Sequence, residues 1–403
     1  MKNSIRSVFG LFGLAALLAG PCQALADDTI TFGAALALTG GMASEGTQVQ
    51  AGYDFYIRHI NERGGIKVGD KTYKVAIKYY DDESSPATSA KLYERLINED
   101  HIRLLIGPYS SGVTMAVSAV TEKYRVPMVV AHAASAAIYN RGYRYLFAVL
   151  TTADQYTANF IKMAAEAKPR GQRVALIGEN DLLPREWMTG AAAQAGAAGL
   201  EVVYNGSFPK GAEDFSSMIE AMRATAPDVV IAAGYTKGMI TLVRQVGEQK
   251  FRPKMFAFPL GPTVPGFIEA LGPLAEGVLE PVQWSPRDNY KDAIFGWTTK
   301  EFVEIYKKET GGRIPDYHPP QSAAALEVFQ LALEKVGSFD SEKLRDAIAQ
   351  TNVETFYGPI RFNEKGQNIA KTHMGVIQVQ NGHPVDVYPT VTAAAPFIYP
   401  LPH

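Results

Sequence analysis

Short apolar segments alternate with amphipathic helical segments along most of the chain, and this alternation runs twice. Strands that alternate with helices form parallel sheets covered by helices on both faces. The first run places strands at 30–38, 74–80, 104–106 and 128–131, and helices at 46–63, 85–99 and 112–124. The second run places strands at 173–178, 201–208, 229–234 and 254–258, and helices at 155–167, 186–199, 214–224 and 238–249. The sequence therefore predicts an α/β fold of two doubly wound, Rossmann-like lobes with a cleft between them, and its candidate ligand residues directly follow the strands.

The N-terminus has the pattern of an export signal. Lys2 and Arg6 precede an apolar run over residues 8–18, and small residues end the segment at 24–26. The apolar run is shorter than the ~20 residues that span a bilayer, which favours a signal peptide over a membrane anchor. We expect cleavage after residue 26 and a periplasmic mature protein.

Charge and cysteine usage exclude several classes of protein. Cleavage removes two positive charges and no negative one, so the formal net charge goes from -2 to -4. A mildly acidic chain lacks the excess of positive charge that binding to nucleic acid requires. The only cysteine, Cys22, lies in the signal segment, so the mature chain has no thiol chemistry.

Motifs for catalysis are absent from the sequence. The glycines at 40, 41 and 46 do not have the dinucleotide-binding spacing, and no phosphate-loop or nucleophile-elbow motif occurs. His318, His373 and His383 have no partner at metal-ligand spacing. We expect no enzyme activity, no cofactor and no metal.

Several ordered segments resemble a known family. They read Asn-Glu-Arg-Gly-Gly-Ile at 61–66, Tyr-Asp-Asp at 80–82, Ile-Gly-Pro-Tyr-Ser-Ser at 106–111 and Tyr-Gly-Pro-Ile-Arg-Phe at 357–362. In this order the chain resembles the type I periplasmic binding proteins, in particular the branched-chain amino-acid (leucine/isoleucine/valine) receptors. The resemblance implies three hinge crossings, near 149, 282–284 and 356–360. Lobe one would then hold residues 27–149 and 285–355, and lobe two residues 150–284 and 356–403.

The resemblance also implies an anion-binding loop after the third strand. Ser111 matches the family serine that holds a ligand carboxylate, with Tyr109 and Ser110 beside it. A hydroxyl and free N–H groups at the start of a helix favour an anion. A simple helix cap by Ser110 or Ser111 is the alternative.

A second loop, at residues 131–135, matches the family segment whose carbonyl and hydroxyl face the ligand. Ala133 and Ser135 inherit those roles. His132 stands where the family has proline, and it either adds a proton-dependent donor or is only a partly buried polar residue.

Other positions concern the body of the ligand. Tyr235 matches a ligand-facing aromatic residue, and Trp187 offers further stacking surface, although aromatic residues at such positions also build cores. Glu45 falls near the cleft mouth, where it either accepts a hydrogen bond from a phenolic hydroxyl or amide, or is solvated.

One position departs from the family pattern. Amino-acid receptors of this family carry an acid at the position aligned with Leu260, where it pairs with the ligand ammonium. Leucine cannot make this pair, and an unpaired buried ammonium is costly. A site that binds a carboxylate on one side and presents the apolar Leu260 on the other favours an aromatic acid. Phe258, Leu183 and Pro184 would be further residues in the wall of this site.

We therefore expect the extracytoplasmic substrate-binding protein of an ABC importer, which captures a small organic carboxylate and delivers it to a membrane permease. A receptor for branched-chain or other amino acids or amides is one alternative, and a sensory ligand-binding protein is another. We expect a monomer.

Overall fold

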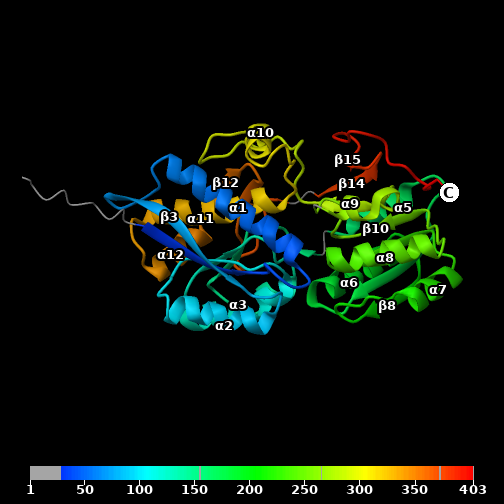
Figure 1. Ribbon diagram of the computed structural model, residues 1–403, viewed down its shortest axis with the longest axis horizontal. Helices are drawn as coiled ribbons and strands as arrows, with labels where there is room; N and C mark the ends of the chain where they lie inside the picture. Colours follow the sequence, from blue (N-terminus) through cyan, green and yellow to red (C-terminus); the bar gives the residue numbers. More distant parts are fainter. Residues whose placement is uncertain (1–28, 154–155, 265, 372–373, 403) are drawn as a thin grey trace, which may run out of the picture.

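The computed structural model describes residues 29–153, 156–264, 266–371 and 374–402. The predicted signal peptide, Cys22 and His373 lie outside the described residues. Within them the chain forms two lobes side by side along the long axis of the molecule (Figure 1).

The first lobe is built on a six-stranded sheet in the order β2-β3-β1-β4-β5-β6. Its strands pair in parallel except for β2, which forms an antiparallel edge with β3. Helices α1 and α11 pack together, as do α2 and α3, and Figure 1 shows the two pairs on opposite faces of the sheet. The strands are β1 (Thr29–Leu36), β2 (Ile66–Val68), β3 (Lys71–Asp81), β4 (Leu105–Ile106), β5 (Met128–Val130) and β6 (Leu146–Ala148). The helices are α1 (Ala43–Glu62), α2 (Pro86–Asn98), α3 (Ser111–Tyr124), α4 (Ala136–Tyr139), α11 (His318–Val336) and α12 (Ser341–Ala349).

The second lobe is built on a seven-stranded sheet in the order β15-β14-β11-β10-β9-β7-β8. Five strands run in parallel, and the late strands β14 and β15 add an antiparallel edge. The strands are β7 (Arg173–Glu179), β8 (Glu201–Phe208), β9 (Val229–Ala233), β10 (Met255–Ala257), β11 (Leu279–Val282), β14 (Gly375–Gln380) and β15 (His383–Tyr388). The helices are α5 (Ala158–Glu166), α6 (Leu182–Ala197), α7 (Ser216–Ala224), α8 (Thr236–Glu248) and α9 (Phe267–Leu271), with the 3₁₀ turn η2 (Gly272–Ala275). The predicted α/β fold of two parallel-sheet lobes is confirmed.

A small unit packs against α1 of the first lobe, where Phe302 and Tyr306 lie 5.2 Å and 5.8 Å from the Phe55 ring. Helix α10 (Thr299–Glu309) starts with a capping box, in which Thr298 and Glu301 satisfy each other's backbone N–H. A two-stranded antiparallel sheet, β12 (Asn352–Thr355) and β13 (Gly358–Arg361), follows later in the chain.

The predicted strand and helix positions agree with the structure to within a few residues, with α6 as the main difference. This helix begins at Leu182 rather than at residue 186, because the Asp181 side chain caps it by accepting from the Leu182 N–H. Pro184 lies in the first turn, where a missing N–H costs nothing.

The chain passes between the two sheets three times: between β6 and β7, after β11, and between β13 and β14. Residues 362–368 contact the first lobe, since Gly366 accepts from the Ala148 N–H at 2.8 Å and the Phe362 and Phe147 rings lie 5.3 Å apart. We therefore propose that the third boundary lies after residue 368 rather than near residues 356–360. The remaining boundaries stay predictions.

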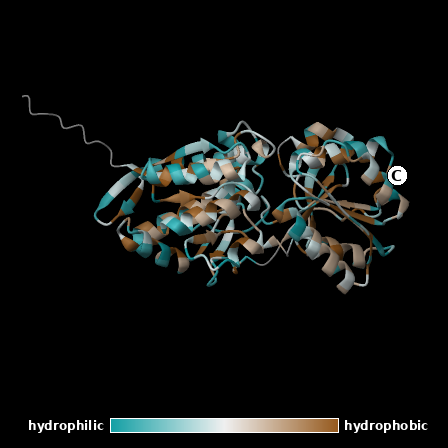
Figure 2. Cartoon of the chain, turned by 90° about the horizontal axis from the view of Figure 1, so that it is seen from below, coloured by the Kyte–Doolittle hydropathy of each residue, from teal (hydrophilic) through white to brown (hydrophobic). Residues whose placement is uncertain are grey.

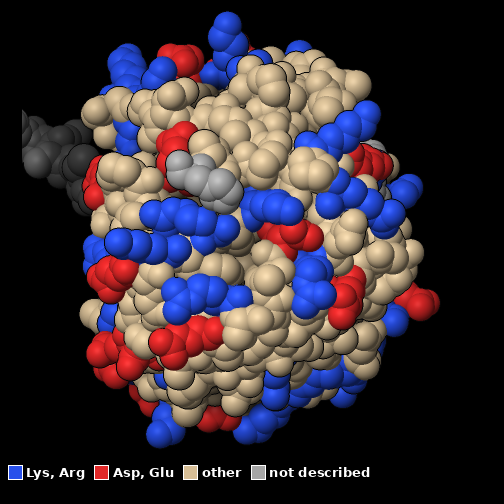
Figure 3. Space-filling view, turned by 90° about the vertical axis from the view of Figure 1, so that its right-hand side faces the viewer, with Lys and Arg blue, Asp and Glu red and all other residues tan. Residues whose placement is uncertain are grey.

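Hydrophobic residues concentrate along the inner strands of both lobes, and hydrophilic residues lie at the outer loops (Figure 2). One core cluster lies within lobe two, and a larger one runs from lobe one across the boundary to Trp187, Tyr235 and Leu260. On the end of the molecule formed by lobe two, acidic and basic side chains are interspersed (Figure 3). Among the described residues no helix is both long enough and apolar enough to cross a membrane.

Candidate functional site: the boundary between the lobes

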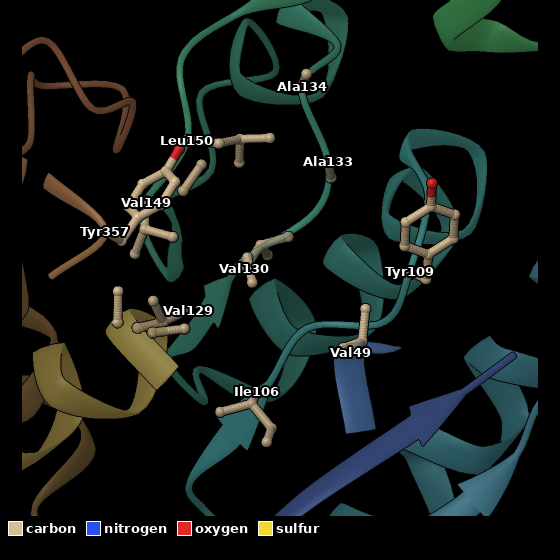
Figure 4. Close-up of a cluster of buried hydrophobic side chains, with 14 of the residues drawn as sticks. Val49, Ile106, Tyr109, Val129, Val130, Ala133, Ala134, Val149, Leu150 and Tyr357 are labelled. Atoms are coloured by element: carbon tan, nitrogen blue, oxygen red, sulfur yellow. The ribbon is translucent and has the colours of Figure 1, made fainter. Parts of the chain in front are cut away.

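Loops that follow the strands of both sheets meet at the boundary. Figure 4 shows two of them, which carry Tyr109 beyond β4 and Ala133 beyond β5. The Tyr109 ring lies 6.3 Å from the ring of Tyr235, which follows β9 of the other lobe. The structure thus brings candidate residues of both lobes together at the carboxyl ends of the strands.

The serine loops of lobe one contact each other. Ser110 caps α3 by accepting from the Val113 N–H at 3.4 Å, which confirms the capping alternative for Ser110. Its backbone φ is 77°, a region that residues other than glycine rarely adopt. Ser111 accepts from the Ser135 N–H at 3.1 Å. The predicted anion-binding Ser111 and the predicted ligand-facing Ser135 are therefore neighbours.

A carboxylate from lobe two reaches this pair of serines. Glu186 of α6 accepts from the Ser135 hydroxyl at 2.6 Å, from the Ala136 N–H at 3.0 Å and from the Ala137 N–H at 3.2 Å. Sequence reasoning missed Glu186. The available signal was its place shortly after β7, which the misplaced start of α6 concealed.

A second carboxylate crosses the boundary in the opposite direction. Glu45 of α1 accepts from the N–H of Thr236, the first residue of α8, at 3.2 Å. Its side chain is buried, with the residue only 1% exposed, so the solvated alternative is wrong. Its other oxygen, Oε2, has no hydrogen-bond partner among the described residues.

An aromatic and imidazole cluster lies behind Tyr109. His132 lies 5.9 Å from the Tyr109 ring and 5.0 Å from the ring of His318. Burial lowers the pKa of His132 well below its ordinary value, and His318 lowers it further. Its Nε2 lies 2.9 Å from the Ser322 hydroxyl. The imidazole is therefore neutral at pH 7, which argues against a proton-dependent donor.

Two other predicted positions have partners within the protein. The carbonyl of Ala133 accepts from the Tyr139 hydroxyl at 2.6 Å rather than facing an open space. Trp187 is buried on α6, with its ring 5.6 Å from that of Tyr156, and its Nε1 has no partner within the part of the chain that the structure describes.

The loop after β10 carries the departure from the family pattern. Leu260 is 4% exposed and joins the core cluster that contains Tyr235. Phe258 instead packs against Phe256 and Phe267 in the core of lobe two, so its expected role as a pocket wall is wrong.

Glu280 of β11 holds the loop after β10. Its carboxyl accepts from the Gly261 N–H at 3.3 Å and from the Thr263 N–H at 2.6 Å. Burial raises the pKa of Glu280 to about 8, so this carboxyl is mostly protonated at neutral pH. It carries little counter-charge for a ligand.

A cavity of about 460 Å³ opens at the boundary beside Tyr235. Gly41, Met42, Glu83 and Ser84 line it from lobe one, and Glu179, Lys210, Lys237 and Thr241 are among the residues that line it from lobe two. Burial raises the pKa of Glu179, and the charge of Glu45 adds to this effect. Among the described residues no group of three or more His, Cys, Asp or Glu is arranged to hold a metal ion.

Two α/β lobes whose strand-end loops converge on a shared boundary are the architecture of a two-lobed solute-binding protein. Residues 29–384 match the family model of the periplasmic binding proteins, and the chain belongs to this family.

Relatives and solved structures refine the comparison. Leu/Ile/Val-binding protein homolog 7 of Brucella suis is 26% identical over 94% of this chain and 96% of its own length. The leucine-binding protein LivK of Thermotoga maritima is 23% identical and superposes with a TM-score of 0.79 over 89% of this chain and 97% of LivK. A solute-binding protein of an ABC transporter from Rhodopseudomonas palustris BisB5, in complex with 3,4-dihydroxybenzoic acid, is 22% identical with a TM-score of 0.76, over 89% and 95% of the two chains. The predicted likeness to the branched-chain amino-acid receptors is confirmed.

Proposed function

We propose that this protein is the substrate-binding subunit of an ABC importer and captures a small organic carboxylate, preferably an aromatic acid, between its lobes. Export by the signal peptide at residues 1–26 and delivery to a membrane permease are part of the proposal. Binding without turnover is the expected activity, because the family and the compared structures are solute-binding proteins.

The donor set around Ser135 carries the proposal. Its hydroxyl and the N–H groups of Ala136 and Ala137 bind the Glu186 carboxylate, so their spacing fits a carboxylate. A ligand carboxylate would use the same donors once Glu186 moved away. Ser111 lies in hydrogen-bond contact with Ser135 and adds a hydroxyl.

The preference for an aromatic body rests on the neighbouring side chains. Leu260 offers hydrocarbon where an amino-acid receptor would need an acid, and Tyr109 and Tyr235 present rings from opposite lobes. Such surfaces favour a flat apolar body over an aliphatic ammonium compound.

An amino-acid receptor is the second candidate. Glu45 and Glu179 are both buried near Tyr235, and buried carboxylates favour a cationic ligand group. This reading agrees with the Leu/Ile/Val-binding name of the Brucella relative.

A thermal-shift screen of the purified mature chain separates the two candidates, because a ligand that binds only the folded protein stabilises it. We expect larger shifts with benzoate and hydroxybenzoates than with leucine, valine or isoleucine. Stabilisation by leucine without any by aromatic acids would refute the aromatic-acid proposal and leave the receptor class intact. Vesicles that contain the cognate permease would then test delivery.

A further inference from the structure

The Glu45 carboxylate is buried at the boundary, and only one of its two oxygens accepts a hydrogen bond. Oε1 accepts from the Thr236 N–H at 3.2 Å, and Oε2 has no partner within the described part of the chain. A buried carboxylate oxygen without a donor is costly, and such groups in folded proteins call for a specific explanation. Stabilisation of its own helix does not require this burial, because the start of a helix favours a carboxylate at an exposed position as well.

A hydroxyl group of lobe two shares this property. The hydroxyl of Thr236 is buried and, like Oε2 of Glu45, has no hydrogen-bond partner in the residues described. The hydroxyl of Tyr235, the preceding residue, is buried beside the Ser110 side chain. Burial raises the pKa of Tyr235 well above its ordinary value, and Asp181, Glu179 and Glu45 raise it further while Ser110 opposes them. The tyrosine therefore stays neutral and can act as a donor or as an acceptor.

The electrostatic setting is acidic. Burial raises the pKa of Glu179, and Glu45 adds to this effect. Two lysines line the neighbouring cavity: Lys210 is paired with Asp181 at 3.2 Å, and Lys237 is exposed to solvent. A group that donates a hydrogen bond suits such surroundings, and a second anion does not.

The position relative to the serine loops indicates the form of the ligand. Glu45 contacts Thr236, which follows Tyr235, whereas the serine loop of Ser110 and Ser111 follows Tyr109. The rings of Tyr109 and Tyr235 are 6.3 Å apart, so they lie between Glu45 and the serine loop. In an α-amino acid the ammonium and the carboxylate share one carbon, whereas a ring separates the polar groups of a hydroxybenzoate.

We propose that Oε2 of Glu45 accepts a hydrogen bond from a hydroxyl at the far end of the ligand, so that the protein selects hydroxylated aromatic acids over unsubstituted ones. This inference rests on the proposed function. Glu45 would then select for the hydroxyl of the ligand, whereas Leu260 would contact its apolar body.

Calorimetric titration of benzoate, 4-hydroxybenzoate and leucine into wild type and Glu45→Gln tests the inference. Glutamine keeps the oxygen that accepts from Thr236 but loses the charge and one acceptor oxygen. Wild type should bind 4-hydroxybenzoate about tenfold more tightly than benzoate, as expected for a site built around a ligand hydroxyl. In Glu45→Gln the ratio of the two Kd values should approach one, with benzoate affinity nearly unchanged.

Glu220→Gln, on the exposed face of α7, is the matched control and should keep the wild-type ratio. If Glu45→Gln does not fold, Glu45→Asp keeps the charge, withdraws the oxygens and should lower the ratio as well. An unchanged ratio in the Glu45 variants, or equal losses for both acids, would overturn the inference while aromatic-acid binding stands. Binding of leucine with no aromatic acid bound by wild type would overturn the proposed function and this inference with it.

Discussion

Glu280 shows how a single buried carboxyl couples stability to pH. Burial raises its pKa from an ordinary 4.5 to about 8. Between these two pH values the folded state binds more protons than the unfolded state, so the contribution of Glu280 is present below pH 4.5 and is lost as pH rises through 8. We expect Glu280→Gln, which cannot ionise, to reduce the fall in unfolding free energy between pH 5 and pH 8 by a few kcal/mol.

Urea unfolding of wild type and Glu280→Gln at several pH values measures this difference. Glu220→Gln serves as the control for losing an exposed carboxyl. Parallel pH profiles for wild type and Glu280→Gln would show that this carboxyl is ionised in the folded protein.

The sequence located the site residues of lobe one better than those of lobe two. Ser111 and Ser135 follow strands in a recognisable pattern, and the structure brings them into contact. Glu186 was missed, since a glutamate near the start of a helix has the appearance of a solvated residue. The carbonyl of Ala133 matched the family pattern and the ring of Phe258 was expected to line the pocket, but both have partners in the protein's own interior.

Among the elements, the start of α6 determines how the lobes contact each other. The Asp181 cap starts the helix at Leu182 and places Glu186 against Ser135 of the other lobe. A ligand carboxylate at Ser135 would have to displace Glu186, because two carboxylates cannot share three donors without strong repulsion.

We expect Glu186→Ala to remove this internal competitor. Each hydrogen bond to a carboxylate contributes a modest net free energy, so aromatic acids should bind about threefold to tenfold more tightly to the variant. Without ligand, the variant should also have a larger radius of gyration in small-angle scattering, because a contact between the lobes is lost. Glu220→Ala is the control, and weaker ligand binding by Glu186→Ala would mean that Glu186 stays in place when the ligand binds.

At the scale of the whole molecule, the first two chain segments that connect the lobes meet at the side chain of Gln283, together with Tyr357 from the turn between β12 and β13. Oε1 of Gln283 accepts from the Thr151 N–H at 3.0 Å and from the Tyr357 hydroxyl at 2.7 Å, and its Nε2 donates to the Tyr156 hydroxyl. Rotation of the lobes about these segments would therefore turn around Gln283.

Gln283→Ala should destabilise the protein by roughly 2–3 kcal/mol, since it leaves several buried groups without their partner. Urea unfolding checks the loss, and the radius of gyration with and without ligand checks the lobe motion. Gln50→Ala on α1 is the control in lobe one. A stability equal to that of wild type would show that Gln283 does not hold the two connecting segments and Tyr357 together.

The sequence by itself determined the α/β class, the two runs of strands and helices and the strand-end loops, because hydrophobic periodicity is a local property that each segment carries with it. Only the tertiary structure decided which groups face each other across the boundary. Ser135 and Glu186 are 51 residues apart and Glu45 and Thr236 are 191 apart, and no local pattern encodes a contact between such positions. These contacts arise from how two separately wound sheets pack, and packing depends on the shapes of both lobes together.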